Sequence, residues 1–338
     1  MKYKLLGKTG LKVSELCLGT MTFGGRGTWT AIGTLPQDEV NDLVKQSVDA
    51  GINFIDTANA YSEGLSEKMT GQAIRDLGLK RDELIIATKV RAKMGEGPND
   101  SGLSRKHILQ QADESLTRLN MDYIDLYQIH GFDPLTPMEE TLEALDSLVK
   151  SGKVRYIGCS NLAAWQVMKA LGISAREHIS RFVSLQAYYT IAGRDLEREL
   201  APMLLDQKMG LMVWSPLAGG LLSGKYTRNN VEKGEGRRAN FDFPPVNKEK
   251  AFDVIDVMQK IAKDKKVSVA QIALSWLLHQ PVVTTVIIGA KKQYQLTDNL
   301  HSVNVKLTED ELGKLNDVSK LQPEYPGWIL ERQGADRR

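Results

Sequence analysis

The chain has 338 residues, 42% of them hydrophobic and 25% charged, with 44 basic and 42 acidic side chains. Such a composition is typical of a globular protein large enough to form an extended core without disulfides or metals. The small net charge of +2 gives no reason to expect nucleic acid or a membrane surface as a partner, and no apolar run reaches the roughly 18 residues that a membrane-spanning helix needs.

The two cysteines, Cys17 and Cys159, both lie within apolar runs. We expect them to be buried free thiols, as in a protein of a reducing compartment. The N-terminus lacks the apolar stretch of a signal peptide, so a cytoplasmic location is expected.

The elements predicted along the chain begin with a small hairpin over residues 3–13, which turns at Thr9-Gly10. Eight short apolar runs follow, rich in Val, Ile, Leu and aromatic residues, and longer helical patterns separate them. These predicted strands end near Gly19, Asp56, Lys89, His130, Ser160, Gln186, Ser215 and Gly289.

Three of the predicted helices carry clear boundary signals. They are Asp38 as the cap of residues 39–50, Ser104 as the cap of residues 105–119, and Pro137 at the start of residues 138–150. Gly51 is expected to stop the first of them, because glycine adopts the left-handed conformation that ends many helices.

Near-continuous apolar runs joined by helices indicate parallel strands that are buried on both faces. Eight such units predict an α/β fold of the closed (β/α)8 TIM-barrel type. The alternative is a doubly wound open sheet, but a dinucleotide binder of that kind carries G-x-G-x-x-G after its first strand. Residues 19–24 read Gly-Thr-Met-Thr-Phe-Gly instead, which disfavours the open sheet.

We therefore predict one domain over residues 1–338, with the hairpin at its N-terminal end. Two connections, residues 21–36 and 216–247, exceed the usual loop length and are expected at the C-terminal face of the barrel. Residues 322–338 are expected to form a C-terminal tail.

Polar residues recur at the C-terminal ends of the predicted strands, where TIM barrels place their chemistry. They are Asp56, Lys89, His130, the pair Ser160-Asn161, and Gln186. Each alone is compatible with a helix cap, a solvated side chain or a structural histidine. Five of them around one end of a barrel predict an active site.

Several chemistries are compatible with such a set. The five histidines form no close pair, which argues against a zinc or iron site. Glycoside hydrolysis needs two facing carboxylates, and Asp56 has only Asp125 and Asp133 as candidate partners. Imine formation by Lys89 is a further alternative, because lysines can form Schiff bases with carbonyl substrates.

Tyr61 favours carbonyl reduction over these alternatives. A neighbouring ammonium stabilises a phenolate and lowers the pKa of the tyrosine, and a carboxylate holds the lysine in place. Asp56, Tyr61 and Lys89 together therefore make a proton donor, and His130 adds a second polar group near the same oxygen. Carbonyl reduction requires a proton at oxygen as hydride reaches carbon.

These residues lie in segments that resemble the aldo-keto reductases. The segment Gly51-Ile-Asn-Phe-Ile-Asp-Thr-Ala-Asn-Ala-Tyr61 is similar to the family signature, and Lys89 and His130 match the family lysine and histidine. The resemblance implies that Tyr61 is the general acid, that Lys89 lowers its pKa, that Asp56 pairs with Lys89 and that His130 orients the carbonyl. It implies an oxidoreductase that acts with a nicotinamide cofactor on a small aldehyde or ketone.

The resemblance continues on the cofactor side. Residues 158–161 and Gln186 are similar to the positions that hold the nicotinamide amide, and Trp214 to the aromatic residue that stacks on the ring. Residues 289–292 are similar to the adenosine-phosphate site, where Lys291 replaces a common arginine and can still meet a 2′-phosphate, so NADP(H) is preferred over NAD(H). The residues expected to bind the cofactor are Gly19, Thr20, Met21, Asp56, Ser160, Asn161, Gln186, Trp214, Ser215, Pro216, Leu217, Gly219, Gly224, Lys225, Gly289, Lys291, Gln295 and Asn299.

Residues 219–226 nearly match the P-loop pattern G-x-x-x-x-G-K-[ST], but Tyr226 stands where the magnesium-binding hydroxyl is required. The resemblance implies that this loop instead wraps the cofactor pyrophosphate through backbone N–H groups. Four basic side chains of the loop are expected either to assist or to remain solvated: Lys225, Arg228, Arg237 and Arg238.

Aromatic residues are expected to line an apolar substrate pocket. Phe23 and Trp29 in the first long loop, and Tyr325 and Trp328 in the tail, are the candidates; packing beneath their own loops is the alternative. The hairpin, the long seventh loop and the chain length resemble the bacterial and channel-subunit-like branches of the family. A nicotinamide-binding regulatory subunit with slow turnover is therefore the alternative function.

Overall fold

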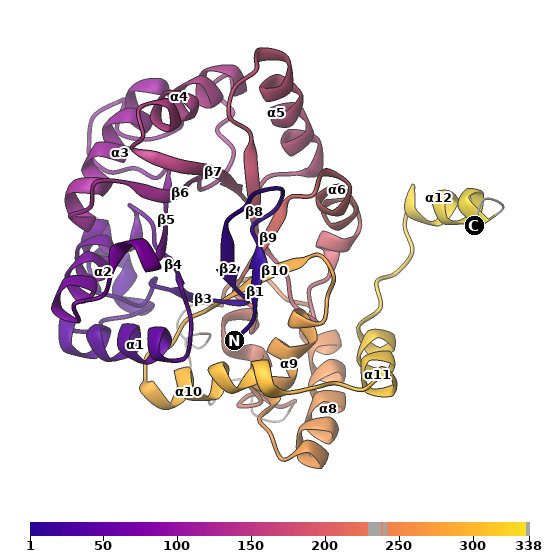
Figure 1. Ribbon diagram of the computed structural model, residues 1–338. Coiled ribbons are helices and arrows are strands. Elements are labelled where there is room, and N and C mark those ends of the chain that lie inside the picture. The colour runs from indigo at the N-terminus through magenta and orange to yellow at the C-terminus, as the bar shows by residue number, and fades with distance from the viewer. Residues whose placement is uncertain (229–237, 239–241, 336–338) are drawn as a thin grey trace.

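Eight parallel strands close into a barrel in the computed structural model, which describes residues 1–228, residue 238 and residues 242–335 (Figure 1). Each strand pairs with its sequence neighbour, and the last strand closes the barrel against the first. The strands are β3 (Leu16–Gly19), β4 (Phe54–Asp56), β5 (Ile85–Val90), β6 (Ile124–Ile129), β7 (Val154–Ser160), β8 (Phe182–Tyr188), β9 (Gly210–Trp214) and β10 (Val283–Ile288). The predicted TIM barrel is confirmed.

The barrel strands end within two residues of the predicted positions. Strands β5, β6 and β10 are buried along their whole length, because side chains of one face enter the barrel interior and those of the other meet the surrounding helices. This double burial is the reason why the strands appear in the sequence as continuous apolar runs.

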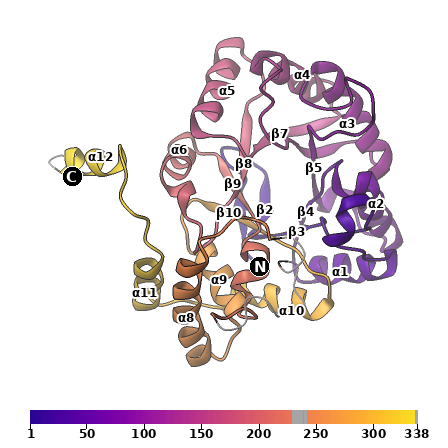
Figure 2. The same cartoon turned by 180° about the vertical axis from the view of Figure 1, so that it is seen from behind.

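Helices surround the barrel (Figures 1 and 2). They are α1 (Gln37–Asp49), α2 (Leu65–Asp76), α3 (Arg105–Leu119), α4 (Met138–Lys150), α5 (Ala164–Glu177), α6 (Leu200–Gln207), α8 (Lys248–Lys265), α9 (Val269–Leu278), α10 (Gln293–His301), α11 (Glu309–Ser319) and, outside the ring, α12 (Gly327–Gly334). Short 3-10 helices are η1 (Gly27–Ala31), η2 (Tyr61–Gly64), η3 (Arg81–Glu83), η4 (Asp195–Glu197), η5 (Ala218–Ser223) and η6 (Ser302–Asn304).

Two of the three predicted helix starts are confirmed and one is wrong. The Ser104 hydroxyl accepts a hydrogen bond from the N–H of His107 at the start of α3, and Pro137 precedes α4. Helix α1, however, begins at Gln37 after Pro36, so Asp38 lies inside its first turn rather than at the cap position. There its carboxylate still interacts favourably with the positive end of the helix dipole.

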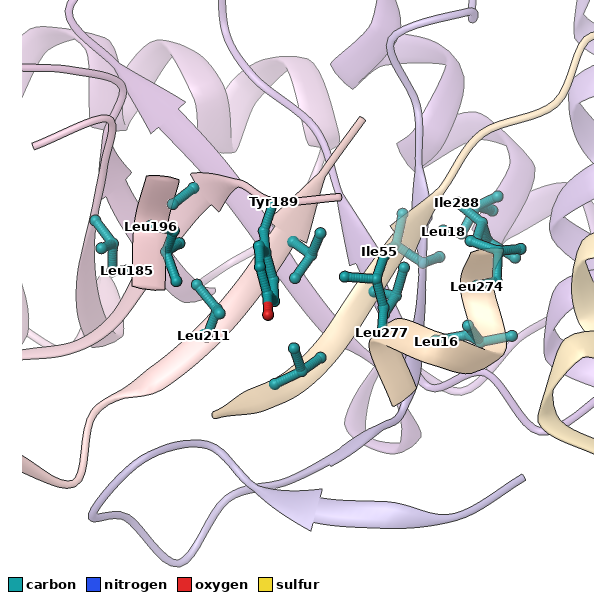
Figure 3. Close-up of a cluster of buried hydrophobic side chains, with 14 of the residues drawn as sticks. Leu16, Leu18, Ile55, Leu185, Tyr189, Leu196, Leu211, Leu274, Leu277 and Ile288 are labelled. Carbon is teal, nitrogen blue, oxygen red and sulfur yellow. The ribbon is translucent and has the colours of Figure 1, made fainter. Parts of the chain in front are cut away.

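The hydrophobic core has two parts. The larger part lies between the barrel and its helices. In the region that Figure 3 shows, Leu16, Leu18 and Ile55 lie close to Leu274 and Leu277 of α9. The smaller part consists of nine buried side chains from the barrel interior and from the hairpin segment that covers it: Leu6, Val13, Cys17, Phe54, Ile85, Ala87, Leu126, Met212 and Ile287.

The predicted hairpin is confirmed and covers the N-terminal end of the barrel (Figure 1). Strands β1 (Tyr3–Leu5) and β2 (Lys12–Ser14) pair antiparallel. The Lys4 ammonium donates to the carbonyl of Val283 at 2.8 Å. Gly7 has a φ of +60°, and a Cβ there would lie 2.3 Å from the carbonyl oxygen of Val183, so only glycine allows the hairpin to approach the strands this closely.

The C-terminal segment leaves the barrel. Helix α11 packs on α8, but beyond Ser319 the chain runs extended to α12, which stands apart from the barrel in both views (Figures 1 and 2). An ion pair of 2.9 Å between Arg198 and Glu324 joins this segment to the barrel. Among the described helices, none combines the length and the apolar character that a membrane span requires.

Candidate active site

Four predicted residues meet at the C-terminal rim, which we define as the ring formed by the C-terminal ends of the barrel strands. Asp56 ends β4, Lys89 lies near the end of β5, and His130 follows β6. Tyr61 begins η2, in the loop after β4. The strand register brings them together because Asp56 pairs with Ala87, two residues before Lys89 on the same face.

Lys89 is the centre of this cluster. Its fully buried ammonium donates to Asp56 Oδ2 at 2.6 Å, to the carbonyl of Thr57 at 2.8 Å and to the hydroxyl of Tyr61 at 3.3 Å. The rings of Tyr61 and His130 meet edge to face with centroids 5.9 Å apart. The structure therefore brings Asp56, Tyr61, Lys89 and His130 into one group.

Burial and neighbouring charges shift the pKa values of Lys89 and His130 in opposite directions. Burial alone lowers the pKa of Lys89, but the neighbouring Asp56 carboxylate and Tyr61 outweigh it, and the pKa is raised above its usual value. Burial, together with the nearby charges of Lys89 and Arg91, lowers the pKa of His130 to about 3. At neutral pH the lysine is charged and the histidine is neutral.

The backbone after Tyr61 is unusual. Ser62, Glu63 and Gly64 all have left-handed conformations, with φ of 49°, 55° and 85°. This conformation costs a non-glycine residue about 1–2 kcal/mol, so the surrounding contacts must hold it. The buried Ser62 hydroxyl donates to the carbonyl of Phe23 at 2.9 Å, which fixes the turn that presents Tyr61.

The second oxygen of Asp56 is held by two glutamines. Gln128 Nε2 donates to Asp56 Oδ1 at 3.0 Å and Gln186 Nε2 donates to the same atom at 2.9 Å. Sequence reasoning placed Gln186 in the site but missed Gln128. The signal was present, because Gln128 is a polar residue in a buried strand, two positions before His130 and so on the same face.

The alternative chemistries lose support from these contacts. A nucleophilic lysine must be uncharged to form an imine, whereas Lys89 is paired with Asp56. Asp125 accepts a hydrogen bond from Arg81 at 2.6 Å, and Asp133 accepts one from the N–H of Leu103 at 2.7 Å. Neither carboxylate faces Asp56, so the described residues offer no carboxylate pair for glycoside hydrolysis.

Of the residues expected at the nicotinamide amide, Ser160 fits best. Its hydroxyl is buried and has no partner among the described residues, which leaves it available to a ligand. The Asn161 amide is engaged at both ends: it donates to the His130 carbonyl at 3.2 Å and accepts from the Trp214 indole at 3.0 Å. Gln186 is bonded to Asp56.

Trp214 is held within an aromatic cluster. Its ring is stacked on Phe243 with centroids 5.8 Å apart and tilted against Tyr188 at 5.2 Å. The next residue, Ser215, has a φ of 50°, and its hydroxyl accepts from the N–H of Gly219 at 3.1 Å. Pro216 is buried and Leu217 half-buried.

The loop after β9 uses much of its own hydrogen-bonding capacity. The N–H groups of residues 218, 219, 220 and 222 all donate within the loop, and Gly219 and Gly224 have φ of 67° and 84°. Lys225 is exposed.

Two arginines of this loop, Arg228 and Arg238, are engaged as well. Arg228 pairs with Glu249 and Asp253 of α8. Arg238 donates to the carbonyls of Ala218 at 2.7 Å and Pro244 at 3.0 Å. These two side chains hold the loop, and Arg237 lies outside the described residues.

The residues expected at the adenosine phosphate gather at the start of α10. No side chain in the described part of the chain caps this helix terminus, and uncapped N–H groups at a helix start favour anions. The N–H of Lys291 donates to Gln295 Oε1 at 2.9 Å, Asn299 is buried and Gly289 is exposed. A basic helix start of this kind fits a phosphate group.

The segment after β3 joins this region to the catalytic group. Gly19 pairs with Asp56 across the strands. The buried Thr20 hydroxyl lies 2.8 Å from that of Ser66, and the Thr22 hydroxyl donates to the Ala290 carbonyl at 3.0 Å. Met21, between the two threonines, is half-buried.

The residues expected to line the substrate pocket lie in three different places. Trp29 contacts Tyr61 with ring centroids 5.2 Å apart. Phe23 is fully buried in the core, contrary to the expectation that it lines a pocket, because its ring packs beneath its own loop. Trp328 lies on α12 and contacts Tyr325 with centroids 6.3 Å apart, so the structure does not bring the tail to the rim.

The part of the chain that the structure describes contains no group of three or more His, Cys, Asp or Glu side chains suited to a metal ion.

Comparison with known proteins extends over nearly the whole chain. Residues 15–320 match the aldo/keto reductase family. The chain is 37% identical over 328 residues to an uncharacterized oxidoreductase of Bacillus subtilis, covering 94% of this chain and 96% of that protein. It is also 37% identical over 336 residues to a probable voltage-gated potassium channel subunit beta of Arabidopsis thaliana, covering 96% and 99%.

A third relative is the versiconal hemiacetal acetate reductase of Aspergillus parasiticus. The two chains are 34% identical over 346 residues, an alignment that covers 97% of this chain and 99% of that protein. The similarity therefore includes both reductases and proteins named as channel subunits.

Proposed function

This chain belongs to the aldo/keto reductase family, and from that premise we propose that it reduces the carbonyl group of an aldehyde or ketone with NADPH, using Tyr61 as the proton donor. The family supports a nicotinamide-dependent oxidoreductase in general. The observation that carries the finer proposal is the contact of 3.3 Å between the Lys89 ammonium and the Tyr61 hydroxyl.

Each residue of the catalytic group has a distinct part in the proposed reaction. Lys89 stabilises the phenolate that Tyr61 becomes once its proton has moved to the carbonyl oxygen. Asp56 keeps Lys89 charged and holds it at 2.6 Å. His130, with its pKa near 3, is neutral and donates a hydrogen bond that orients the carbonyl without supplying a proton.

The cofactor side supports NADP(H) over NAD(H). When bound, the nicotinamide cofactor supplies the hydride. The unpartnered Ser160 hydroxyl would accept or donate to the nicotinamide amide, Trp214 would contact its ring, and Lys291 at the start of α10 would meet the 2′-phosphate. Gln295 in the first turn of α10 and Asn299 in the second complete this end of the proposed site.

The proposed substrate is a small carbonyl compound with an apolar or aromatic body. Trp29 lies against Tyr61 and would line the substrate side, as aromatic residues commonly do in such sites. A relative of Schizosaccharomyces pombe, 35% identical over 349 residues, is named a putative aryl-alcohol dehydrogenase, which supports aromatic aldehydes as the first class to test. Both cysteines are free and buried, which supports the proposed cytoplasmic location.

The experiment is NADPH oxidation by the purified protein against a panel of aliphatic and aromatic aldehydes, with Tyr61→Phe in parallel. We expect the wild-type protein to turn over and the variant to lose about 100-fold or more in kcat, since general acid catalysis contributes about that much. Cofactor binding, followed by fluorescence, should be unchanged.

A variant that retains wild-type turnover would contradict the role of Tyr61. If the wild-type protein binds NADPH but reduces no carbonyl in the panel, the regulatory alternative gains weight. That alternative has one observation in its favour, the similarity to proteins named as potassium channel subunits.

A further inference from the structure

The barrel interior contains a layer of polar side chains, of which Asp56 also belongs to the catalytic group. Asp56, Gln128 and Gln186 come from β4, β6 and β8, which are alternate strands of the barrel. In closed barrels, side chains from alternate strands share one interior layer. The next residues down on the same face of β4 and β6 are Phe54 and Leu126, which belong to the apolar interior core.

The sequence makes room for Gln128 in this layer. Gln128 pairs with Lys89 on one side and with Gly158 on the other. A Cβ at position 158 would lie 3.2 Å from Cγ of Gln128 and 2.8 Å from the Ser184 hydroxyl. Glycine at 158 therefore leaves space for the glutamine side chain, which is fully buried.

The side-chain amide of Gln128 contacts Asp56 and Gln186. Its Nε2 donates to Asp56 Oδ1 at 3.0 Å, and its Oε1 accepts from Gln186 Nε2 at 3.4 Å. Asp56 thus has one oxygen on Lys89 and the other between two amide donors. These donors together fix the orientation of the buried carboxylate.

From this arrangement we infer that Gln128 is a positioning residue, which acts through Asp56 to keep Lys89 aligned with Tyr61. The inference rests on the proposed function, and the family resemblance places Gln186 at the nicotinamide amide. If the Gln186 amide also binds a ligand, it holds Asp56 less firmly. The Gln128 amide keeps its hydrogen bond to Asp56 in either case. Gln128 is then the permanent donor on Asp56 Oδ1.

Two substitutions test this inference. Gln128→Leu keeps a similar volume and removes the donor, and Gln128→Glu keeps the shape but places a carboxyl beside Asp56. Losing the amide dipole leaves more negative potential near Tyr61, and an added carboxylate increases it further. The pH at which Tyr61 ionises should therefore rise in Gln128→Leu and rise more in Gln128→Glu.

The readout is tyrosinate absorbance at alkaline pH, taken as the difference between each protein and its counterpart carrying Tyr61→Phe. Steady-state kinetics accompany it. We expect kcat of Gln128→Leu to fall on the order of tenfold, while the substrate KM and the Kd of NADPH stay within about twofold, because geometry rather than binding is lost. If Gln128 has a purely structural role, the pH at which Tyr61 ionises should be the same in the variants as in the wild-type protein.

Ser184→Ala is the matched control. Ser184 is buried two residues before Gln186 on β8, one layer lower in the barrel, and its hydroxyl has no partner among the described residues. Its removal should change neither the ionisation of Tyr61 nor kcat.

Wild-type ionisation of Tyr61 in both Gln128 variants would overturn the inference, and if Gln128→Leu fails to fold, Gln128→Glu alone decides. The titration needs no turnover. A wild-type protein that reduces nothing would therefore overturn the proposed function without affecting this test.

Discussion

At the scale of single residues, burial acts on each group according to the charge it carries. Lys89 is buried beside an anion and stays charged, whereas His130 is buried beside cations and stays neutral. The same desolvation disfavours both charged forms. The charge of the nearest neighbour then decides whether each group is protonated. The result is a charged group that tunes Tyr61 and an uncharged group that can donate a hydrogen bond.

The first prediction concerns His130 and acid stability. Its pKa is about 3 in the folded protein against an ordinary value of 6.5. Between these values the unfolded chain binds a proton at His130 and the folded chain does not. The free energy of unfolding therefore falls as the pH is lowered through this window, by up to about 1.4 kcal/mol per pH unit from this group.

His130→Asn removes that contribution. Urea unfolding at several values between pH 7 and pH 4 should show a shallower loss of stability in the variant than in the wild-type protein. Parallel curves for the two proteins would show that His130 is not buried in its neutral form.

The second prediction concerns Lys291. If its ammonium meets the 2′-phosphate, Lys291→Met should raise the Kd of NADPH by about tenfold, the effect of losing about 1.4 kcal/mol. The Kd of NADH should not change, because that cofactor lacks the phosphate.

Lys292→Met is the matched control, since the adjacent Lys292 is exposed and lies 3.8 Å from Glu39. Equal weakening of both cofactors by Lys291→Met would argue against a 2′-phosphate contact. Isothermal titration of the wild-type protein and of both variants with NADPH and with NADH gives the six affinities needed.

At the scale of elements, the strands could be predicted from the sequence and the turns between them could not. The strands are buried on both faces, so their apolar runs are local signals. The left-handed turn at residues 62–64 depends on a hydrogen bond to Phe23, 39 residues earlier in the chain. No local pattern at Ser62 or Glu63 indicates this contact, because neither residue favours that conformation.

The same distinction explains the site. Asp56, Lys89 and His130 could be predicted because each lies at a strand end in a recognisable segment. Gln128 was missed because its importance comes from the way β6 faces β4 across the barrel interior. Phe23 was misplaced because its burial depends on how its loop folds back. These are tertiary facts, and the sequence carries them only indirectly.

The third prediction tests the packing of α2 against α3. Gly71 lies in α2, and a Cβ there would come within 2.0 Å of the carbonyl oxygen of Leu119. Gly71→Ala should therefore destabilise the protein by about 1–3 kcal/mol, because the two helices must move apart.

Gly172→Ala provides the control. At this exposed glycine of α5, a Cβ would have no atom of the described residues within 4 Å. The substitution should stabilise the protein by about 0.5–1 kcal/mol through helix propensity alone. Chemical denaturation measures both changes, and equal effects at the two positions would contradict the close contact.

At the scale of the whole molecule, the barrel and its C-terminal tail are almost independent. The tail contacts the barrel through Arg198, which pairs with Glu324 and donates to the Gln322 carbonyl. Exposed ion pairs of this kind contribute about 1 kcal/mol or less. Helix α11, by contrast, buries Leu315 completely.

The fourth prediction follows from this difference. Truncation after Leu321 should leave the melting temperature and the substrate KM unchanged, whereas truncation after Leu307, which also removes α11, should lower the melting temperature. An increase in KM on the shorter deletion would restore the substrate role expected for Trp328.

The hairpin across the N-terminal end has a consequence for the order of events in turnover. Strands β1 and β2 cover that end, and apolar side chains lie in the interior between the hairpin and the catalytic group, so the described residues leave no route to Tyr61 through the barrel. In the proposed reaction, both reactants would therefore enter and both products would leave at the C-terminal rim. Whichever of the two molecules binds deeper would then bind first and leave last, so the proposed reaction predicts an ordered sequence of binding and release.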